Sequence, residues 1–326
     1  MTGIDRYDYA FDPVGESWPA RLLRQVEPGA KVLELGPGPG AMTRVLKDRG
    51  HRVVTVERDP GALPLLRALG VSVIEADLNE TSSWLNALGD ERFDTVLACD
   101  VFEHLVRPDE VLKALTKVMH PQGHLIVSVP NVAHVGLMAS LRLGHFDYVD
   151  KGLLDATHLR FFTRRSFERL LLENAWLPIH IEAHEVAVED TEFAWLWERL
   201  PQRWRDVFRT DWDEAEVYQW MVVATSAGSD GQRQRLAREL TDVRYELDTV
   251  RRELQALRKV HDVEHRELVE HQKAFAEAKA IIGRLERELQ EARDHIQSLE
   301  QTVAATTRSQ PSAGTAGSSW WRRWFD

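Results

Sequence analysis

Short apolar segments alternate with segments of helical periodicity through the first 131 residues of this 326-residue chain. Strands separated by single helices pair in parallel through right-handed crossovers. The pattern therefore predicts an α/β fold, a doubly wound and mostly parallel seven-stranded sheet that binds its ligand beyond the carboxyl ends of the strands. An apolar run at 31–40 ends in a glycine-rich turn; the next strands are expected at 51–59, 71–77, 92–100 and 124–131, with helices at 41–50, 63–70 and 108–120.

The following segment predicts one more helix and the last two strands. Thr163 is a suitable N-cap for that helix, and the closing strands are expected at 177–186 and 218–226. Between these strands, about residues 187–216 form an insertion rich in Trp and Arg. We expect either a pair of surface helices that pack their Trp side chains onto the core, or a wall of the substrate pocket or a docking face.

The composition changes after about residue 226, where Gly and Pro become rare and Leu, Glu, Arg and Ala dominate. Near the C-terminus, small polar residues typical of a flexible linker precede a tip with the sequence WWRRWFD. These changes predict a globular body at 1–226, a coiled coil at 230–303, a flexible linker at 304–319 and a Trp- and Arg-rich tip at 320–326.

Apolar residues recur within 230–303 in alternating steps of four and three, from Leu236 to Val303 without a slip in register. Only His261, Glu264 and His271 interrupt the apolar series. A sustained 3.5-residue repeat is typical of a left-handed coiled coil. Because a single helix would leave this apolar seam in water, we expect a parallel homodimer or homotrimer.

Charge and cysteine content exclude several classes of protein. With 41 Lys and Arg against 52 Asp and Glu, the net charge is −11, which argues against a nucleic-acid partner. The single cysteine, Cys99, excludes an intramolecular disulfide framework and any Cys-rich metal site. The sequence has no apolar run long enough to span a membrane and no N-terminal signal pattern. We therefore expect a cytoplasmic protein.

The first predicted strand leads into the sequence ELGPGPG, in which Glu34 precedes Gly36, Gly38 and Gly40. Glycines allow positive φ and let a ligand approach the backbone closely. The turn lacks the Lys and the hydroxyl of a triphosphate-binding loop. Glu57 ends the second strand, where it could accept hydrogen bonds from both hydroxyls of a ribose. An NAD-dependent dehydrogenase stays an alternative, although it would need a rhythm closer to G-x-G-x-x-G.

Four motifs in order, ELGPGPG, Glu57, EAD at 75–77 and FDTVLACDVFEHL at 93–105, resemble the class I S-adenosylmethionine-dependent methyltransferases over roughly residues 5–226. The resemblance implies a Rossmann-like fold, S-adenosylmethionine as the cofactor and methyl transfer as the reaction. It places the glycine turn at the amino-acid part of the cofactor, Glu57 at its ribose, the EAD motif at its adenine and the start of DVFEHL at its sulfonium. The cofactor contacts implied are Glu34, Gly36, Gly38, Gly40, Glu57, Asp77, Leu78, Asp100 and Val101.

An oxygen acceptor needs a base to remove its proton, and histidine has a suitable pKa. His104 follows the fourth strand, close to where the methyl group should project. His158 lies three residues after Asp155, whose carboxylate could orient its ring. We expect His104, His158 and Asp155 in catalysis and His134 as a further candidate, with packing or hydrogen bonding as the alternative role for each histidine. Because no compact ligand spacing stands out, we expect no metal.

The stretch at 130–171 resembles a bacterial methyltransferase subgroup often found beside glycosyltransferases in surface-polysaccharide pathways. This resemblance implies O-methylation of a sugar hydroxyl in a glycan or glycan precursor. One alternative acceptor is a quinone-like or other small hydroxylated metabolite, for which Phe146, Tyr148, Phe161 and Phe162 could form an aromatic pocket. A different class of function is a catalytically degenerate scaffold that works through its coiled coil.

The tip at 320–326 combines aromatic rings with guanidinium groups, a mixture typical of a bilayer interface. Several copies carried on an oligomer would bind with avidity. We expect the tip to bring the protein to the inner membrane surface, with docking to a partner enzyme or an ordinary frayed terminus as alternatives.

Overall fold

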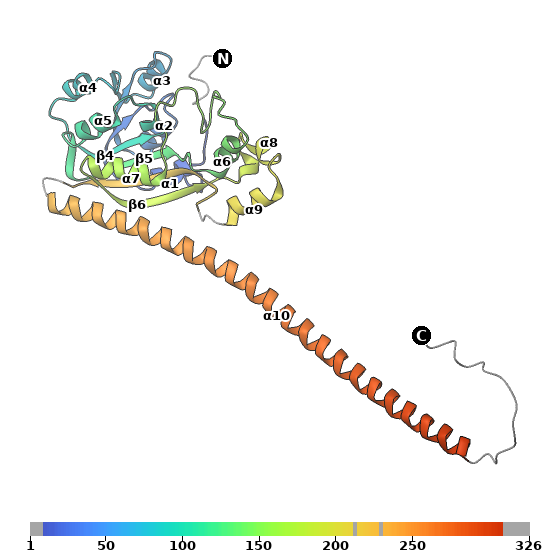
Figure 1. Ribbon diagram of the computed structural model, residues 1–326. Helices are drawn as coiled ribbons and strands as arrows, with labels where there is room; N and C mark the ends of the chain where they lie inside the picture. The colour runs from blue at the N-terminus through green and yellow to red at the C-terminus, as the bar shows by residue number, and fades with distance from the viewer. Residues whose placement is uncertain (1–8, 211–213, 228–230, 309–326) are drawn as a thin grey trace. The chain divides into compact units, whose positions relative to one another are not determined.

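The computed structural model describes residues 9–210, 214–227 and 231–308 (Figure 1). The chain divides into two compact units, residues 1–253 and 254–326. The predicted linker at 304–319 and tip at 320–326 lie largely or wholly outside the described residues.

A single sheet of seven strands organises the first unit, in the order β3-β2-β1-β4-β5-β7-β6. The first five strands pair in parallel, and β7 pairs antiparallel with both β5 and β6. The predicted fold is thus confirmed, and the order of the strands reverses between β1 and β4. The strands are β1 (Lys31–Leu35), β2 (Arg52–Glu57), β3 (Ser72–Glu75), β4 (Phe93–Cys99), β5 (Met119–Pro130), β6 (Trp176–Glu185) and β7 (Val217–Ser226).

Helices cover both faces of this sheet (Figure 1). Apolar residues of α1 and α2 pack on one face, and those of α4, α5 and α7 pack on the other. The helices of the first unit are α1 (Trp18–Leu23), α2 (Ala41–Asp48), α3 (Ala62–Ala68), α4 (Thr81–Leu88), α5 (Pro108–Leu115), α6 (Val135–Arg142), α7 (Arg164–Glu173), α8 (Ala194–Trp197) and α9 (Gln202–Thr210).

The central strands are apolar at almost every position because both of their faces are buried. In β1, Val32 packs toward α1 and α2, while the next residue, Leu33, packs toward the opposite layer. Successive side chains point to opposite faces of a strand, so a continuous apolar run fills both cores. The same reasoning explains why these short runs indicated strands in the sequence.

The helix expected at 108–120 is the main correction to the predicted elements. α5 ends at Leu115, and β5 already begins at Met119, which pairs with Phe93 of β4. Val118 and Met119 are both buried, so their apolar character extended the helical pattern into the next strand. Gly123 then allows a close approach, because a Cβ there would lie 2.9 Å from the Asp94 carbonyl oxygen.

The expected N-cap of the helix at 164–173 is confirmed, and helices occur in the Trp- and Arg-rich segment. Thr163 caps α7, and its hydroxyl and that of Ser166 form a reciprocal capping box. The Trp- and Arg-rich insertion contains the helices α8 and α9. Trp197 is buried in a separate apolar cluster with α6, whereas Trp195 is exposed.

The predicted rod is one helix, α10 (Gly231–Arg308). Its first turns belong to the first unit, where Arg238 donates a hydrogen bond to the Leu172 carbonyl and Arg165 lies over the ring of Tyr245. Within the described residues, no helix combines the length and the apolar character needed to cross a bilayer.

Candidate functional site

A cavity of about 1240 Å³ lies at the carboxyl edge of the sheet. Its wall includes residues that end or follow each of the strands β1 to β5, as expected at a reversal of strand order. Typical sites for one small molecule have roughly 300–1,000 Å³, so this cavity has room for two adjacent ligands. Every predicted cofactor residue except Gly40 contributes to the wall.

The glycine-rich turn after β1 depends on backbone conformations that favour glycine. Gly36, Gly38 and Gly40 all have positive φ. Gly36 also lies against Val101, whose Cγ2 would be 3.2 Å from an added Cβ. Gly36 and Gly38 line the cavity, whereas Gly40 begins α2 and packs against α3. The first two glycines therefore offer backbone to a ligand, and the third sets the packing of the helix.

Glu34 is buried below this turn, with 3% of its surface exposed. Burial, together with the nearby charge of Glu57, raises the pKa of Glu34 to about 7, although Thr43 donates a hydrogen bond of 2.7 Å to its carboxylate. A neutral or cationic ligand group suits this position, since an anion would meet a buried acid.

Glu57 is held at the end of β2 by three backbone N–H groups. One oxygen accepts from Arg58 and Asp59 at 2.7 and 2.8 Å, and the other accepts from Gly38 at 3.0 Å. A carboxylate offers about four acceptor positions, so roughly one stays open to a ligand. The glycine turn occupies one acceptor position of the Glu57 carboxylate, and the expected contact with a ribose stays a prediction.

Asp77 follows β3 and is also largely engaged. Its carboxylate accepts hydrogen bonds from the backbone and side chain of Asn79 and forms an ion pair with Arg58. Although burial acts to raise it, these hydrogen bonds and the Arg58 charge hold the pKa of Asp77 below its usual value. Leu78, the next residue, lines the cavity, and its carbonyl accepts from the Trp84 indole.

Asp100 follows β4 and lines the cavity, and its backbone has a φ of 52°. Ser128 of β5 donates to its carboxylate at 2.8 Å, and Gln219 of β7 donates to the same oxygen. Burial raises the pKa of Asp100 despite these hydrogen bonds. Val101, beside it, is buried against the glycine turn.

The structure brings the three expected catalytic residues to one side of the cavity. The rings of His104 and His158 meet edge to face, with 4.8 Å between centroids. The carboxylate of Asp155, however, accepts from the hydroxyl and backbone N–H of Thr157, and Nδ1 of His158 faces the Leu153 carbonyl at 3.2 Å. The Asp155 carboxylate thus accepts two hydrogen bonds from Thr157, a partner that the sequence did not indicate.

Glu103, which the sequence analysis left without a role, lies beside this pair of histidines. It is 1% exposed and lines the cavity, and among the described residues neither carboxylate oxygen has a hydrogen-bond partner. Burial, with the charges of Asp100 and Asp155, raises its pKa well above its usual range. One Glu103 oxygen and one ring nitrogen from each histidine lie within 4.8 Å of one another, close enough to hold a metal ion, a grouping that sequence spacing did not indicate.

The remaining wall mixes polar and apolar side chains from segments far apart in the sequence. It includes the start of the Trp- and Arg-rich insertion, so that segment supplies both packing helices and part of the pocket. No sequence pattern marked the polar members of this wall, because only the crossing of loops brings them together. They are Lys151, His184, Asp190, Thr191, Glu192 and Tyr218.

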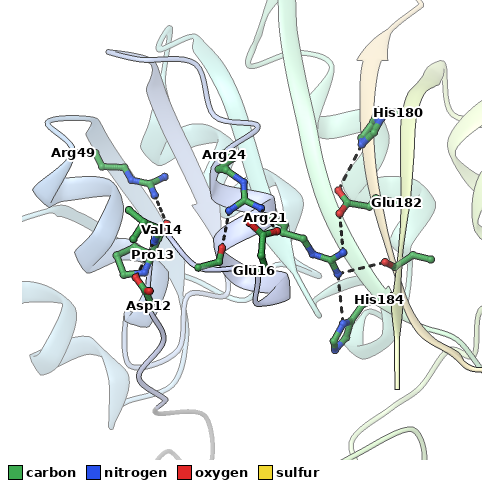
Figure 2. Close-up of polar contacts among 12 residues, drawn as sticks. Asp12, Pro13, Val14, Glu16, Arg21, Arg24, Arg49, His180, Glu182 and His184 are labelled. Carbon is green, nitrogen blue, oxygen red and sulfur yellow. Dashed lines mark hydrogen bonds and ion pairs between the residues drawn. The ribbon is translucent and has the colours of Figure 1, made fainter. Parts of the chain in front are cut away.

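Arg21 ties the N-terminal segment to this wall. Figure 2 shows its guanidinium directed from α1 toward β6, where it pairs with Glu182 at 2.9 Å and contacts His184 Nδ1 at 3.5 Å. Burial and the Arg21 charge lower the pKa of His184. Tyr9 and Trp18, on the same segment, also line the cavity.

His134 occupies a structural position rather than a catalytic one. It caps α6 by accepting from Gly136 N–H at 3.1 Å, and its other ring nitrogen lies 3.0 Å from the Val186 carbonyl. Both ring nitrogens are thus engaged with backbone in a buried site.

Comparisons with known proteins give the family. A family model described as a methyltransferase domain matches residues 8–176. A ubiquinone biosynthesis O-methyltransferase of Dinoroseobacter shibae is 27% identical over 179 residues, covering 53% of this chain and 71% of that protein. One of Hahella chejuensis is 31% identical over 127 residues, 37% of this chain and 53% of that protein. A solved S-adenosylmethionine-dependent methyltransferase from Archaeoglobus fulgidus aligns with a TM-score of 0.46 and 18% identity, covering 64% of this chain and 92% of that one.

Proposed function

Because the chain belongs to the methyltransferase-domain family and is a class I S-adenosylmethionine-dependent methyltransferase, we propose that it methylates a hydroxyl oxygen of a sugar, in a glycan or glycan precursor. The observation that carries the choice of acceptor is the chemistry of the cavity wall beyond the strand ends. That wall presents Lys151, Asp190, Glu192 and Tyr218, which suit a ligand rich in hydroxyl groups.

A flat apolar acceptor is less well supported. Phe146, Tyr148 and Phe161 pack against one another but are exposed, and none of the three belongs to the described wall of the cavity. Phe162, the fourth ring considered, is buried in the apolar core and is also absent from that wall. A quinone-like acceptor stays the second candidate because the two curated relatives are named ubiquinone biosynthesis O-methyltransferases.

The strand-end residues fit the cofactor. Glu34, Glu57, Asp77 and Asp100 give this part of the wall an acidic character that suits a cation, and the Gly36 backbone is open to close approach. S-adenosylmethionine, when bound, supplies an electrophilic methyl group on a positively charged sulfur. The chain's own task is then to orient the acceptor oxygen and to remove its proton.

We assign proton removal to His104. It lies in the wall beside Asp100 and Val101, and its Nδ1 lies 3.1 Å from the Thr157 carbonyl oxygen, so that Nε2 carries the lone pair. His158 packs against the His104 ring, and the unpartnered carboxyl of Glu103 is available to bind an acceptor hydroxyl. No step of this assignment requires a metal.

The decisive experiment is a methyl-transfer screen with isotope-labelled S-adenosylmethionine against neutral sugars, oligosaccharides, nucleotide-activated sugars and quinone precursors. Labelling of a sugar supports the proposal, and labelling of a quinone precursor alone refutes it. His104→Gln should lower kcat by about 10²–10⁴-fold, the usual contribution of a general base. His145→Gln is the matched control, because His145 pairs with Asp147 outside the cavity wall and should retain activity.

The same preparation separates an enzyme from a scaffold. Isothermal titration with S-adenosylmethionine should give saturable binding, and no binding at millimolar cofactor would favour the degenerate scaffold. A place in a surface-polysaccharide pathway remains part of the proposal and depends on the sugar result.

We also propose that α10 forms a parallel coiled coil with a second or third copy of the chain. The apolar residues of the seam are about half exposed in the single chain, from Leu240 and Leu247 to Leu285 and Leu299. Burying apolar surface is the main favourable term in association, and this row has the spacing of a coiled-coil seam. The membrane or partner contact of 320–326 lies outside the described residues and stays a prediction, testable by liposome flotation with and without the tip.

A further inference from the structure

We infer that Thr157 is a positioning residue, which with Asp155 fixes the tautomer and orientation of the His104 imidazole. The inference deepens the proposed function, since it rests on His104 as the base. It concerns two contacts made across 53 positions of the sequence: Nδ1 of His104 lies 3.1 Å from the Thr157 carbonyl oxygen and 3.1 Å from the Thr157 hydroxyl oxygen.

The positions of the hydrogen atoms follow from the partners. A carbonyl oxygen can only accept, so the contact with the Thr157 carbonyl requires the hydrogen on Nδ1 of His104. The Thr157 hydroxyl donates its own hydrogen to Asp155 at 2.6 Å, and its oxygen is thereby left to accept from the same Nδ1–H. Both Thr157 atoms therefore select the Nδ1–H tautomer, whose Nε2 is the proton acceptor.

Asp155 sets the direction of the hydrogen bonds that run from His104 through the Thr157 hydroxyl. It is 4% exposed, and its carboxylate accepts from the Thr157 backbone N–H at 2.8 Å as well as from the hydroxyl. Without that carboxylate the hydroxyl hydrogen could turn toward Nδ1 and select the opposite tautomer, in which Nε2 carries the hydrogen and cannot act as a base. The Asp155 carboxylate thus acts on the His104 ring through the Thr157 hydroxyl.

The two segments are also fixed to each other by their backbones. The Glu103 carbonyl accepts from Leu159 N–H at 2.7 Å and from Arg160 N–H at 2.9 Å. These bonds join the 3₁₀ helix η2 (Phe102–His104) to the loop that carries Thr157, so the His104 ring and its two acceptors keep their geometry. His158 packs against the ring at 4.8 Å and limits its rotation.

In the reaction, the proton of the acceptor hydroxyl would pass to Nε2 of His104 while an oxygen lone pair forms the bond to the methyl carbon. The bond between that carbon and the cofactor sulfur would break, with its electron pair left on sulfur. The imidazolium then carries one hydrogen on each nitrogen, with Nδ1–H still bound to Thr157, and it returns the Nε2 proton to water.

The test reads the tautomer directly and needs no acceptor. Full-length protein with ¹⁵N-labelled histidine is treated with a chelator, and long-range ¹H–¹⁵N correlations are recorded, with His104→Gln identifying the His104 signals. The wild type and Thr157→Ser should show the Nδ1–H tautomer, because serine retains the hydroxyl. In Thr157→Val the ratio of the Nδ1–H to the Nε2–H form should fall about two- to tenfold, the effect of one net hydrogen bond.

An Nε2–H tautomer in the wild type, or an unchanged ratio in Thr157→Val, overturns the inference. If Thr157→Val does not fold, as judged by circular dichroism, Thr157→Ala removes the same hydroxyl from a smaller side chain, and the same fall in the ratio is expected; an unchanged ratio there overturns the inference as well. Because neither sugar nor cofactor enters the measurement, a failed search for a sugar acceptor would refute the proposed function and leave this result standing.

Discussion

Replacing Glu57 by Gln should release the glycine-rich turn from β2. One oxygen of the new amide could keep the bonds to Arg58 and Asp59, but the NH₂ group would then face the Gly38 N–H, which now donates to the carboxylate at 3.0 Å. The Gly38 N–H and the new NH₂ group would both be donors, whereas in the wild type the Gly38 N–H meets a charged acceptor. The substitution thus removes one hydrogen bond to a charged group and changes the volume of the side chain very little.

The magnitude follows from that single bond. A hydrogen bond to a charged group contributes about 1.5–3 kcal/mol, and Glu57 is only 8% exposed, so solvent compensates little. We expect Glu57→Gln to lower the free energy of unfolding by that amount. Cofactor binding must then also reorder the loosened glycine turn, which costs the same free energy. Because each 1.4 kcal/mol changes an equilibrium constant tenfold, the affinity of the protein for S-adenosylmethionine should fall about 10- to 100-fold.

Urea unfolding followed by tryptophan fluorescence and titration calorimetry with S-adenosylmethionine measure the two effects. Glu75→Gln is the matched control, because Glu75 ends the neighbouring strand and forms only an exposed ion pair with Arg67, worth about 0–1 kcal/mol. An unfolding midpoint for Glu57→Gln equal to that of the control would refute the structural role. Weaker cofactor binding with unchanged stability would instead assign Glu57 to the ribose alone.

Three further predictions test the buried acid, the third glycine and the rod. The folded-state pKa of Glu34, about 7, lies above its unfolded value, so the stability that Glu34 contributes is complete below about pH 4.5 and is lost as the pH rises through 7. In the wild type, the free energy of unfolding measured in urea should therefore be lower at pH 8 than at pH 5. Glu34→Gln should remove up to about 3 kcal/mol of this difference. Gly40→Ala should destabilise by about 2–4 kcal/mol, since its Cβ would lie 2.9 Å from two side chains, whereas Gly50→Ala, with similar φ and nothing within 4 Å, should lose only about 1 kcal/mol. Leu285→Lys should reduce the mass of the oligomer in light scattering toward 37.4 kDa, and Glu286→Lys should leave it unchanged; a monomeric wild type would contradict the coiled coil.

The sheet could be predicted because each buried strand is marked by its own residues. A run such as VVTVE carries its strand preference and its burial within a few positions, and the strand before it ends in glycines that require positive φ. α1, α4 and α6 escaped prediction, although they are about as short as α2, α3 and α5, which the sequence did indicate. The end of α5 was misplaced because the buried residues Val118 and Met119, which follow the helix, extended its apolar pattern.

The candidate site also has a part that could be predicted from the sequence and a part that could not. Residues at strand ends could be placed from the sequence, because topology brings the carboxyl ends of parallel strands to one edge. Their hydrogen-bond partners could not. The three N–H groups on Glu57, the Gln219 amide on Asp100 and the link from Asp155 to Thr157 depend on how loops cross that edge.

The buried acids of the cavity explain why a cofactor of positive charge fits this fold. Burial raises the pKa of Glu34, Asp100 and Glu103 together, so ionising all three without a counter-charge is unfavourable. Within the described wall, the fixed cations Arg58 and Lys151 lie on segments other than those that carry these acids. A cationic ligand in the cavity offsets the cost of ionisation, and by linkage it stabilises the folded chain most when the acids are charged. The same acidity disfavours a phosphate-bearing ligand, which is why the strand-end carboxylates distinguish this cavity from a nucleotide site.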